Sequence, residues 1–290
     1  MSLAILLQLI VNGLFTGGIY ALVAIGLTLI YGVMLILNFA HGEFLMLGMY
    51  IAFWAFTLFN IDPYLSALLA AVLVFGLGAL IQRGLIQHVL NSHPLNQIVL
   101  LLGVSTLITG LVQFFWSADP RSIHVSYETA VVAAFGLRFS IPKMVAFFSA
   151  LFIALGLYAF LRATKTGKAI RAVSQSRQAA SLMGINVNWI YILTFGIGTA
   201  VTAVGGVLLT PTYTLIPTVG QQFAVIAFVV VVLGTMGNFI GAFLGGLIIG
   251  VVEAFAGYFL GGDVKIIASM LVFILILLFK PAGLLGKKAA

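Results

Sequence analysis

The chain is divided along its length into long apolar runs, separated by short breaks rich in polar residues, proline and glycine. A transmembrane helix needs about 20 apolar residues to cross the hydrocarbon core of a bilayer. Eight runs approach or exceed this length, and none alternates between apolar and polar residues as the strands of a membrane β-barrel do. The pattern predicts an all-α polytopic transmembrane helix bundle that forms a single domain, residues 1–290. The predicted segments are residues 3–31, 39–60, 63–82, 94–116, 141–161, 187–210, 239–260 and 264–280.

A ninth apolar run, at residues 222–234, is too short to cross the hydrocarbon by itself. Pro211 and Pro217 break the chain just before it. We expect a broken or re-entrant half-helix here, because irregular backbone at membrane depth is tolerated only where protein or a watery cavity surrounds it. The bundle thus has about eight or nine membrane segments, depending on whether residues 211–236 cross the membrane or enter and return.

The composition requires lipid as the surrounding solvent. Hydrophobic residues make up 63% of the chain and charged residues 7%, which leaves too little polar surface for a water-soluble domain of 290 residues. Cysteine is absent, which excludes disulfides and thiolate metal ligands, and the four scattered histidines do not replace them. The stretch Met1–Leu7 has no basic residue and leads into an apolar run too long for a signal peptide, so we expect a retained membrane helix.

Lysine and arginine are distributed unevenly, and in a membrane protein their placement reports orientation rather than nucleic-acid binding. One basic group lies in residues 83–93, and another lies in the C-terminal tail. The largest lies in residues 162–186, and no carboxylate occurs between Glu128 and Glu253 to offset it. We therefore predict that residues 162–186 face the cytosol, whereas the loop 117–140 and the N-terminus face outside. The two later groups are Arg162, Lys165, Lys168, Arg171 and Arg177, and Lys280, Lys287 and Lys288.

Glycines recur at every fourth residue in several places, a spacing that lets helix backbones approach closely where lipid supplies no hydrophobic driving force. This spacing predicts a tightly packed bundle. We favour packing within one subunit over an interface between subunits, although the spacing fits both. The glycines are Gly13 and Gly17, then Gly237, Gly241 and Gly245, and finally Gly246 and Gly250.

The chain contains no nucleotide-binding loop of the form G-x-x-x-x-G-K-[ST]. The nearest stretches, residues 167–169 and 286–288, lack the upstream glycine and the hydroxyl residue. The motifs H-E-x-x-H and G-x-S-x-G and any convergent acidic cluster are also absent. We therefore expect a chain that is not an enzyme and holds no cofactor or metal. If ATP drives its activity, another chain binds the ATP.

Two carboxylates interrupt the apolar segments, where an ionised group is expensive unless it faces protein or water. Glu43 follows a helix break together with Asn38 and His41. These three side chains either line a cytoplasmic vestibule, as part of a translocation path or gate, or cap and connect adjacent helix ends. Glu253 lies nearer the outer end of its segment, and it either takes part in the path or extends to the lipid headgroups.

The stretch of residues 166–185 is the most specific feature of the sequence. Read as one helix, it places small residues on one face and polar residues on the neighbouring face, and Gly184 suits the end of the helix. A narrow face of small residues favours close docking against a partner over a helix lying on lipid, because Ala and Ser offer little apolar area to insert. The small face comprises Ala172, Ser176, Ala179, Ala180 and Met183, and the polar face comprises Arg171, Gln175 and Gln178.

Three stretches carry a resemblance to a known family: residues 37–50 (LNFAHGEFLMLGMY), 171–186 (RAVSQSRQAASLMGIN) and 232–242 (VLGTMGNFIGA). They resemble the permease subunits of bacterial branched-chain amino acid ABC importers, specifically the smaller of the two permeases. The resemblance extends over nearly the whole chain in the right order. It implies a multi-pass protein of the bacterial inner (plasma) membrane that takes up leucine, isoleucine and valine. Permeases for urea and short amides look alike in these motifs and stay an alternative.

The resemblance also implies partners. These are a sister permease in a heterodimer, two cytosolic ATPase subunits that bind the ATP, a binding protein that delivers the small-molecule substrate from outside, and membrane lipid. Residues 162–186 would couple the permease to the ATPases, although Ser176 and Gln178 stand where the family more often has acidic residues. The coupling residues would be Gly167, Lys168, Arg171, Ala172, Ser176, Ala179, Ala180, Met183 and Gly184.

An ion-coupled secondary transporter or channel is the rival class. It would require an ion-coupling or selectivity site built from intramembrane charges, or repeated halves. The sequence offers two carboxylates, Glu43 and Glu253, and no clear internal repeat. The importer permease is therefore the favoured interpretation.

Overall fold

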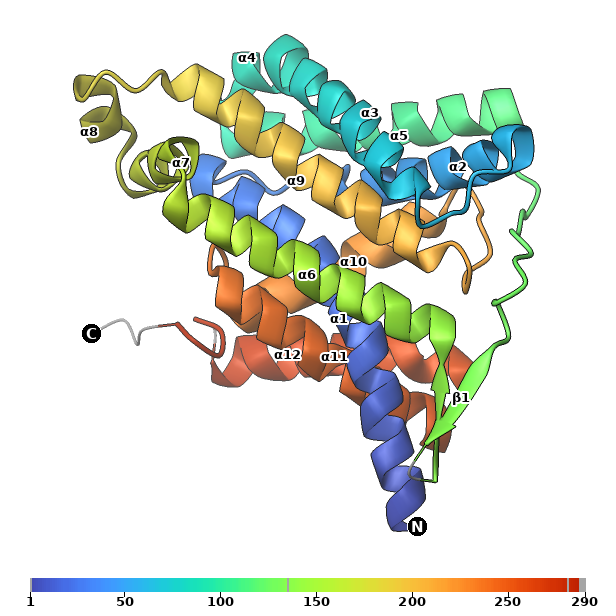
Figure 1. Ribbon diagram of the computed structural model, residues 1–290. Coiled ribbons are helices and arrows are strands. Elements are labelled where there is room, and N and C mark those ends of the chain that lie inside the picture. The colour runs from blue at the N-terminus through green and yellow to red at the C-terminus, as the bar shows by residue number, and fades with distance from the viewer. Residues whose placement is uncertain (1, 135, 281, 287–290) are drawn as a thin grey trace.

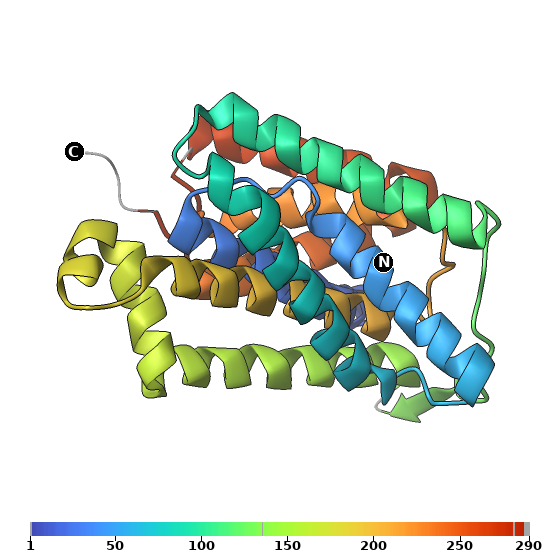
Figure 2. The same ribbon diagram turned by 90° about the horizontal axis from the view of Figure 1, so that it is seen from above.

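The computed structural model describes residues 2–134, 136–280 and 282–286. Long helices run between two ends of the molecule (Figure 1). One end carries the short helices α7 (Lys165–Gln175) and α8 (Arg177–Leu182), and the other carries a small β-hairpin. The view from above shows the same two ends on opposite sides of the bundle (Figure 2). Seven of the described helices are long and apolar enough to cross a membrane, which confirms the predicted helical bundle.

The helices begin and end close to the predicted breaks. At the starts of two of them, Asn186 and Asn238 accept hydrogen bonds from backbone N–H groups three residues later, as N-cap residues do. The predicted segment 63–82 extends further, because α3 (Ser66–Ile81) continues through a π-helical turn (Gln82–Ile86) into α4 (Gln87–Val89). The other helices are α1 (Leu3–Met34), α2 (His41–Phe59), α5 (Pro94–Trp116), α6 (Ile141–Ala163), α9 (Val187–Leu209), α10 (Val219–Gly234), α11 (Phe239–Phe259) and α12 (Lys265–Phe279), the last preceded by a short 3-10 turn (Gly262–Val264).

The end that carries the β-hairpin, called the hairpin end below, gathers the segments predicted to lie outside. The antiparallel strands β1 (Val131–Ala134) and β2 (Leu137–Ser140) lie within the predicted loop 117–140, where the sequence analysis predicted no strand. Near the N-terminus, the amide side chain of Gln8 donates to the carbonyl oxygen of Arg138 at 2.7 Å and accepts from its N–H at 2.8 Å. The N-terminal part of α1 and this loop therefore share one end, as the charge pattern predicts.

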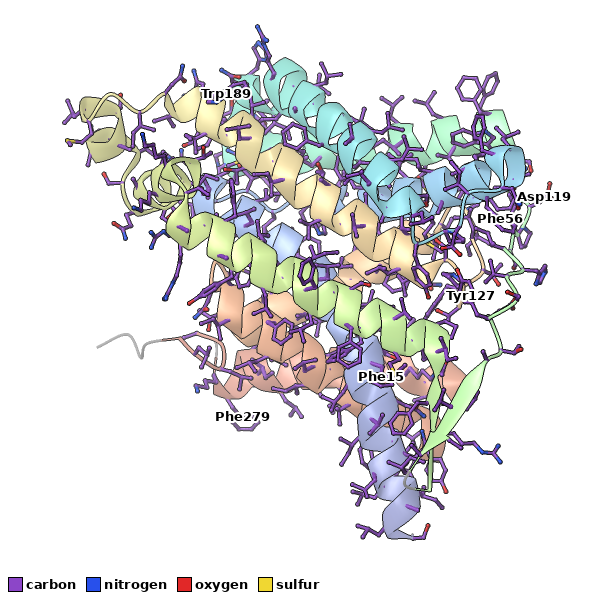
Figure 3. All side chains as sticks on the ribbon, viewed as in Figure 1. Phe15, Phe56, Asp119, Tyr127, Trp189 and Phe279 are labelled. Carbon is purple, nitrogen blue, oxygen red and sulfur yellow. The ribbon has the colours of Figure 1, made fainter. Side chains whose placement is uncertain are left out.

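The same end also holds the loops that follow α2 and α9. Tyr127 donates its hydroxyl to the carboxylate of Asp62 at 2.7 Å. Burial and this hydrogen bond raise the pKa of the Tyr127 phenol above its ordinary value, because an ionised phenol would face the carboxylate. Arg121 pairs with Leu215 through two backbone hydrogen bonds of 2.9 and 2.8 Å. Figure 3 shows Asp119 and Tyr127 at this end and Trp189 at the opposite one.

The ninth apolar run, residues 222–234, lies in the half-helix α10 (Val219–Gly234), which together with the segment before it crosses the bundle. After α9 ends, residues 210–218 fold back into the bundle, and α10 then runs to the end that carries α7 and α8, called the α7–α8 end below. There the backbone N–H of Leu284 donates to the carbonyl oxygen of Leu233 at 2.8 Å. Residues 211–236 therefore cross the bundle rather than enter and return, and the described C-terminal residues lie on the side of residues 162–186. Lys287 and Lys288 lie outside the described residues.

The helix α2 also begins inside the bundle, which the sequence analysis did not predict. After α1 ends, residues 35–40 turn back, and the ring nitrogen Nε2 of His41 lies 2.9 Å from the carbonyl oxygen of Val23. At 1.5 Å per residue, Val23 lies about 16 Å along the axis of α1 from its last residue, Met34. This is roughly half of a hydrocarbon core about 30 Å thick. The predicted segment 39–60 thus starts near the middle of the membrane.

The helices α2 and α10 are both called half-helices below because each begins inside the bundle, although α2 has 19 residues, and they belong to an inverted repeat of topology (Figure 1). α1 runs from the hairpin end to the α7–α8 end, whereas α9 runs in the opposite direction. Each is followed by a return segment and a half-helix, α2 or α10, and then by two further helices, α3 and α5 or α11 and α12. No internal repeat was visible in the sequence, because the repeat is one of chain direction and packing, which many apolar side chains satisfy equally well.

The glycine spacing serves packing inside the chain. α1 lies against α11 so closely that a Cβ on Gly13 would lie 2.6 Å from the Cα of Val251, and one on Gly17 would lie 2.8 Å from the Cα of Leu247. Gly246 and Gly250 meet the backbone of α1 in return. The favoured interpretation of the spacing, close packing within one subunit, therefore agrees with the structure.

Candidate functional site

Buried polar side chains surround the point where α2 begins inside the bundle. Asn38 and His41 are fully buried. Nε2 of His41 lies 2.9 Å from both the Val23 carbonyl oxygen and the Thr202 hydroxyl oxygen. Because Thr202 donates its own proton to the carbonyl of Gly198 at 2.8 Å, Nε2 of His41 is the donor in both contacts. His41 therefore fastens the start of α2 to both α1 and α9.

Asn38 and Glu43 hold the same junction on either side of His41. The side-chain oxygen of Asn38 accepts from the N–H of Ala40 at 3.1 Å and shapes the turn that leads into α2. Glu43 lies in the first turn of α2, where the helix dipole favours an anion, and it accepts a 2.7 Å hydrogen bond from Ser105 of α5. Glu43 is 1% exposed. These contacts favour the connection of helix ends over an open vestibule.

The two half-helices touch where both begin. A Cβ on Gly220 would lie 2.6 Å from the carbonyl oxygen of Gly42, and a Cβ on Gly42 would meet the carbonyl of Gly220. Only glycine at both positions permits this approach, because the space beside each Cα is filled by backbone that cannot move aside as a side chain can. The start of α2 and the start of α10 are thus locked together near the middle of the bundle.

Glu253 does not extend to the lipid headgroups. Its side chain is 5% exposed, and its two carboxylate oxygens accept hydrogen bonds of 2.7 Å, one from the hydroxyl of Tyr20 and one from that of Ser269. The three residues come from α11, α1 and α12, so the carboxylate joins three helices. Sequence reasoning missed both hydroxyl partners. For Ser269 the available signal was a single hydroxyl residue in the otherwise apolar run 266–279, whereas Tyr20 is one of several polar residues in its run and carried no such signal.

The stretch of residues 166–185 is not one helix. α7 ends at Gln175 and α8 begins at Arg177, with Ser176 in extended conformation between them. The hydroxyl oxygen of Ser176 accepts from the N–H of Ala179 at 3.2 Å. Serine favours this N-cap position over a helix interior, because its side chain replaces the missing backbone acceptor. The single continuous helix predicted from the sequence is therefore wrong, whereas Gly184, with φ of +81°, ends α8 as expected.

The break divides the predicted small-residue face. Ala180 is 3% exposed and packs in the core, and Ala172 is half-buried against the same core. Ser176 and Ala179 are exposed. The prediction that Ala180 lies free to meet a partner is therefore wrong, because α8 folds back so that this residue faces its own bundle.

The remaining predicted coupling residues also differ in their surroundings. Gly167 is buried where α6 bends into α7, with the backbone of Leu161 filling the space beside its Cα. Lys168 and Arg171 are exposed, and Met183 is 83% exposed. Leu182, which sequence reasoning did not single out, is 88% exposed beside it. The tip of α8 thus presents two large apolar side chains.

Arg177 anchors α8 to the bundle. Its guanidinium donates to the carbonyl oxygen of Met34, at the end of α1, at 2.7 Å and lies 5.4 Å from the centre of the Tyr191 ring. These contacts join α8 to α1 and α9, two helices that cross the molecule. They hold α8 beside the turn that leads from α1 back to α2.

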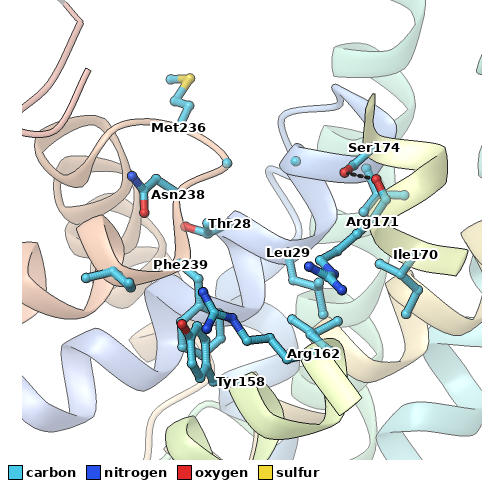
Figure 4. A pocket seen from close by; sticks show the side chains of 15 residues that line it. Thr28, Leu29, Tyr158, Arg162, Ile170, Arg171, Ser174, Met236, Asn238 and Phe239 are labelled. Atoms are coloured by element: carbon cyan, nitrogen blue, oxygen red, sulfur yellow. Dashed lines mark hydrogen bonds between the residues drawn. The ribbon is translucent and has the colours of Figure 1, made fainter. Parts of the chain in front are cut away.

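A cavity of about 480 Å³ opens between α7 and the turn that joins α10 to α11 (Figure 4). Arg162 and Arg171 line it, and Arg162 lies 4.7 Å from the centre of the Tyr158 ring. Thr28 of α1 and Asn238 of the turn also line it. The cavity separates α7 from the turn that follows α10, whereas α7 packs against α1 and α9.

Residues 9–279 match the family described as branched-chain amino acid transport system, permease component. This chain belongs to that family. It is 35% identical to the high-affinity branched-chain amino acid transport system permease protein BraD of Pseudomonas aeruginosa, over 97% of this chain and 96% of the relative. Identity to LivH of Escherichia coli K12 is 34%, with the same coverage. A probable LivH of Methanocaldococcus jannaschii is 29% identical over 91% of this chain and 88% of that protein.

As a branched-chain permease of this family, the chain is a multi-pass protein of the inner membrane and a transport subunit of an ABC importer. Repeated halves were expected of an ion-coupled secondary transporter, and the structure contains them. Repeated halves therefore do not distinguish a secondary transporter from an importer permease. The family match distinguishes the two classes, because the family is that of branched-chain amino acid transport permease components.

Proposed function

We propose that this chain takes up branched-chain amino acids as the permease subunit of an ATP-driven importer. Family membership over residues 9–279 is the observation that carries the proposal, and the relatives named as high-affinity branched-chain amino acid permeases match 97% of the chain. Separate ATPase subunits bind the ATP, a sister permease completes the membrane unit, and a binding protein supplies the substrate at the hairpin end.

Uptake of radiolabelled leucine tests the substrate. Cells that carry the complete transporter should accumulate leucine, and deletion of this chain alone should abolish that uptake. Unlabelled isoleucine and valine should compete, whereas urea and acetamide at the same excess should not. If the deletion leaves leucine uptake intact and removes uptake of urea or acetamide, the short-amide alternative replaces the proposal.

The tip of α8 is the proposed contact with the ATPases. Leu182 and Met183 lie at the end of the molecule that the basic residues predict to be cytosolic, and large apolar side chains exposed at such a position suit insertion into a groove on a partner. The two helices α7 and α8 then carry nucleotide-driven motion to α1, through the hydrogen bond of Arg177 to Met34 and through the packing of α7 against α1.

Co-purification tests this contact. The double variant Leu182→Ala, Met183→Ala should retain the fold but lose most of the ATPase subunits, since a buried anchor of an interface contributes roughly 2 kcal/mol or more. Leu3→Ala is the matched control, because Leu3 is 72% exposed at the opposite end. The purified chain alone should hydrolyse no ATP. Full ATPase recovery with the double variant would move the contact elsewhere.

A further inference from the structure

Two adjoining cavities lie at the hairpin end, one beside the outer loop and one beside Glu253. The first, about 310 Å³, is lined by residues of the loop 117–140 and of the segment 210–214. The second, about 340 Å³, lies mainly between α1 and α11 and has Glu253 in its wall. Lys143 and Tyr213 line both. The two cavities therefore adjoin at these two side chains, and the second reaches a carboxylate buried within the helices.

The second cavity brings opposite charges together. Lys143 comes from the first turn of α6 and Lys265 from the first turn of α12. The stem of Lys265 lies against Gly257, which is one helical turn beyond Glu253 on α11, so the ammonium group and the carboxylate share one face of that helix. Neither lysine forms an ion pair within the part of the chain whose side chains the structure describes.

Glu253 keeps room for another donor. A carboxylate has about four lone-pair sites, and the hydroxyls of Tyr20 and Ser269 occupy one on each oxygen. Those two hydrogen bonds fix the direction of the carboxylate without neutralising it. A cationic group entering the cavity can therefore form charge-assisted hydrogen bonds with Glu253.

We propose that the second cavity, together with the first that adjoins it, forms a vestibule that receives a zwitterionic α-amino acid. Lys143 and Lys265 bind the α-carboxylate, Glu253 binds the α-ammonium group, and Leu9, Ala254 and Tyr258 face the aliphatic side chain. The proposal rests on the proposed function, and names where this chain meets its substrate. Ligand pockets of small molecules occupy about 300–1,000 Å³, and the second cavity is of that size.

The charge arrangement selects for the zwitterion. A neutral amide such as urea would displace the water around the two lysines and the carboxylate without offering either sign of charge in return, which costs free energy. An amino acid satisfies both signs at once and adds an apolar side chain for the wall between α1 and α11. Tyr213 lies between the two cavities and lines both.

Cysteine protection tests the vestibule in the complete transporter. The chain has no cysteine, so Ala254→Cys introduces a single thiol into the wall of the second cavity. Millimolar leucine should slow labelling of this thiol by a membrane-impermeant maleimide by about tenfold, which corresponds to occupancy near 90% by the relation between free energy and population. Leucinamide, which lacks the carboxylate, and 4-methylpentanoate, which lacks the ammonium group, should protect far less. Ser126→Cys in the outer loop is the control and should label equally with and without leucine.

A second substitution tests whether Lys143 binds the α-carboxylate of the ligand. In the Ala254→Cys background, Lys143→Ala should abolish the difference between leucine and leucinamide, while Arg138→Ala, an exposed cation of the same end outside both cavities, should preserve it. Absence of protection by leucine, or undiminished discrimination in Lys143→Ala, would refute the vestibule. If such complexes still transport leucine, the proposed function stands without it. If the wild-type complex transports urea and not leucine, the proposed function itself fails.

Discussion

The contact between the two half-helices gives the sharpest prediction for stability. A Cβ on Gly220 would lie 2.6 Å from the carbonyl oxygen of Gly42, 2.7 Å from its carbonyl carbon and 3.0 Å from the nitrogen of Glu43. Ordinary van der Waals contact begins at 3.4 Å, so the backbones must separate by about 0.8 Å to accept the methyl group of Gly220→Ala. All three obstructing atoms are backbone, and no side-chain rotation relieves them.

The expected cost follows from overpacking. Forcing one methyl group into a filled core typically costs about 1–3 kcal/mol, and the helix propensity of alanine returns at most about 0.5–1 kcal/mol. Separation of the half-helices also strains the buried hydrogen bonds of His41 on the same turn of α2. We expect a net loss of about 1–2 kcal/mol, which corresponds to a melting temperature lower by several degrees.

The control is Gly103→Ala in α5. Gly103 is exposed, and a Cβ there would meet nothing within 4 Å, so only the propensity gain applies. Both variants are purified in the same detergent, and unfolding is followed by loss of the monodisperse peak on heating. A melting temperature of Gly220→Ala equal to or above that of Gly103→Ala would refute the account of the half-helix contact.

Four further outcomes are expected. Ala180→Trp should lower the thermal stability of the purified chain by itself, since Ala180 packs in the core, and a variant as stable as wild type would contradict this. Arg177→Ala should raise hydrogen exchange in α8 by about ten- to hundredfold, through loss of a charge-assisted hydrogen bond of about 1.5–3 kcal/mol, while Arg177→Lys restores it only partly. In sealed cells an impermeant maleimide should label Ser126→Cys and not Ser174→Cys, and the reverse result would invert the topology. Because the pKa of Tyr127 is raised, the contribution of Tyr127 to stability is complete below about pH 10 and is lost as the pH rises further. The protection of the loop 117–140 against hydrogen exchange should therefore fall more steeply with rising pH in wild type than in Tyr127→Phe.

The sequence by itself determined the architecture of the membrane part. Each apolar run had to become a helix, since lipid offers no partner to backbone groups, and the predicted starts of α5 and α6, Pro94 and Ile141, agree with the structure to the residue. The motifs also identified the family, because residues 37–50 and 171–186 combine polar and small residues in an order that a merely hydrophobic sequence would not have.

The fate of individual polar residues depended on tertiary structure. Glu253 looked free to extend to the headgroups, but the hydroxyl groups that hold it come from two other helices, α1 and α12, and Tyr20 of α1 is 233 residues away in the sequence. In the same way, the amphipathic pattern of residues 166–185 fitted one helix. The break at Ser176 arises because α8 gains more from packing Ala180 into the core and from the hydrogen bond of Arg177 to α1 than from continuing α7.

The half-helices mark the limit of what apolar runs reveal. Run length reports how much apolar chain is available but not the depth at which a helix begins, so residues 39–60 were read as an ordinary span. The depth of α2 is set by the contact of His41 with α1 and α9 and by the meeting of Gly42 with Gly220. Sequence thus determined which segments enter the membrane, because hydrogen bonding in lipid is decided locally along the chain. Tertiary structure decided where two of them start and which side chains hold Glu43 and Glu253, because those depend on close contacts between different helices.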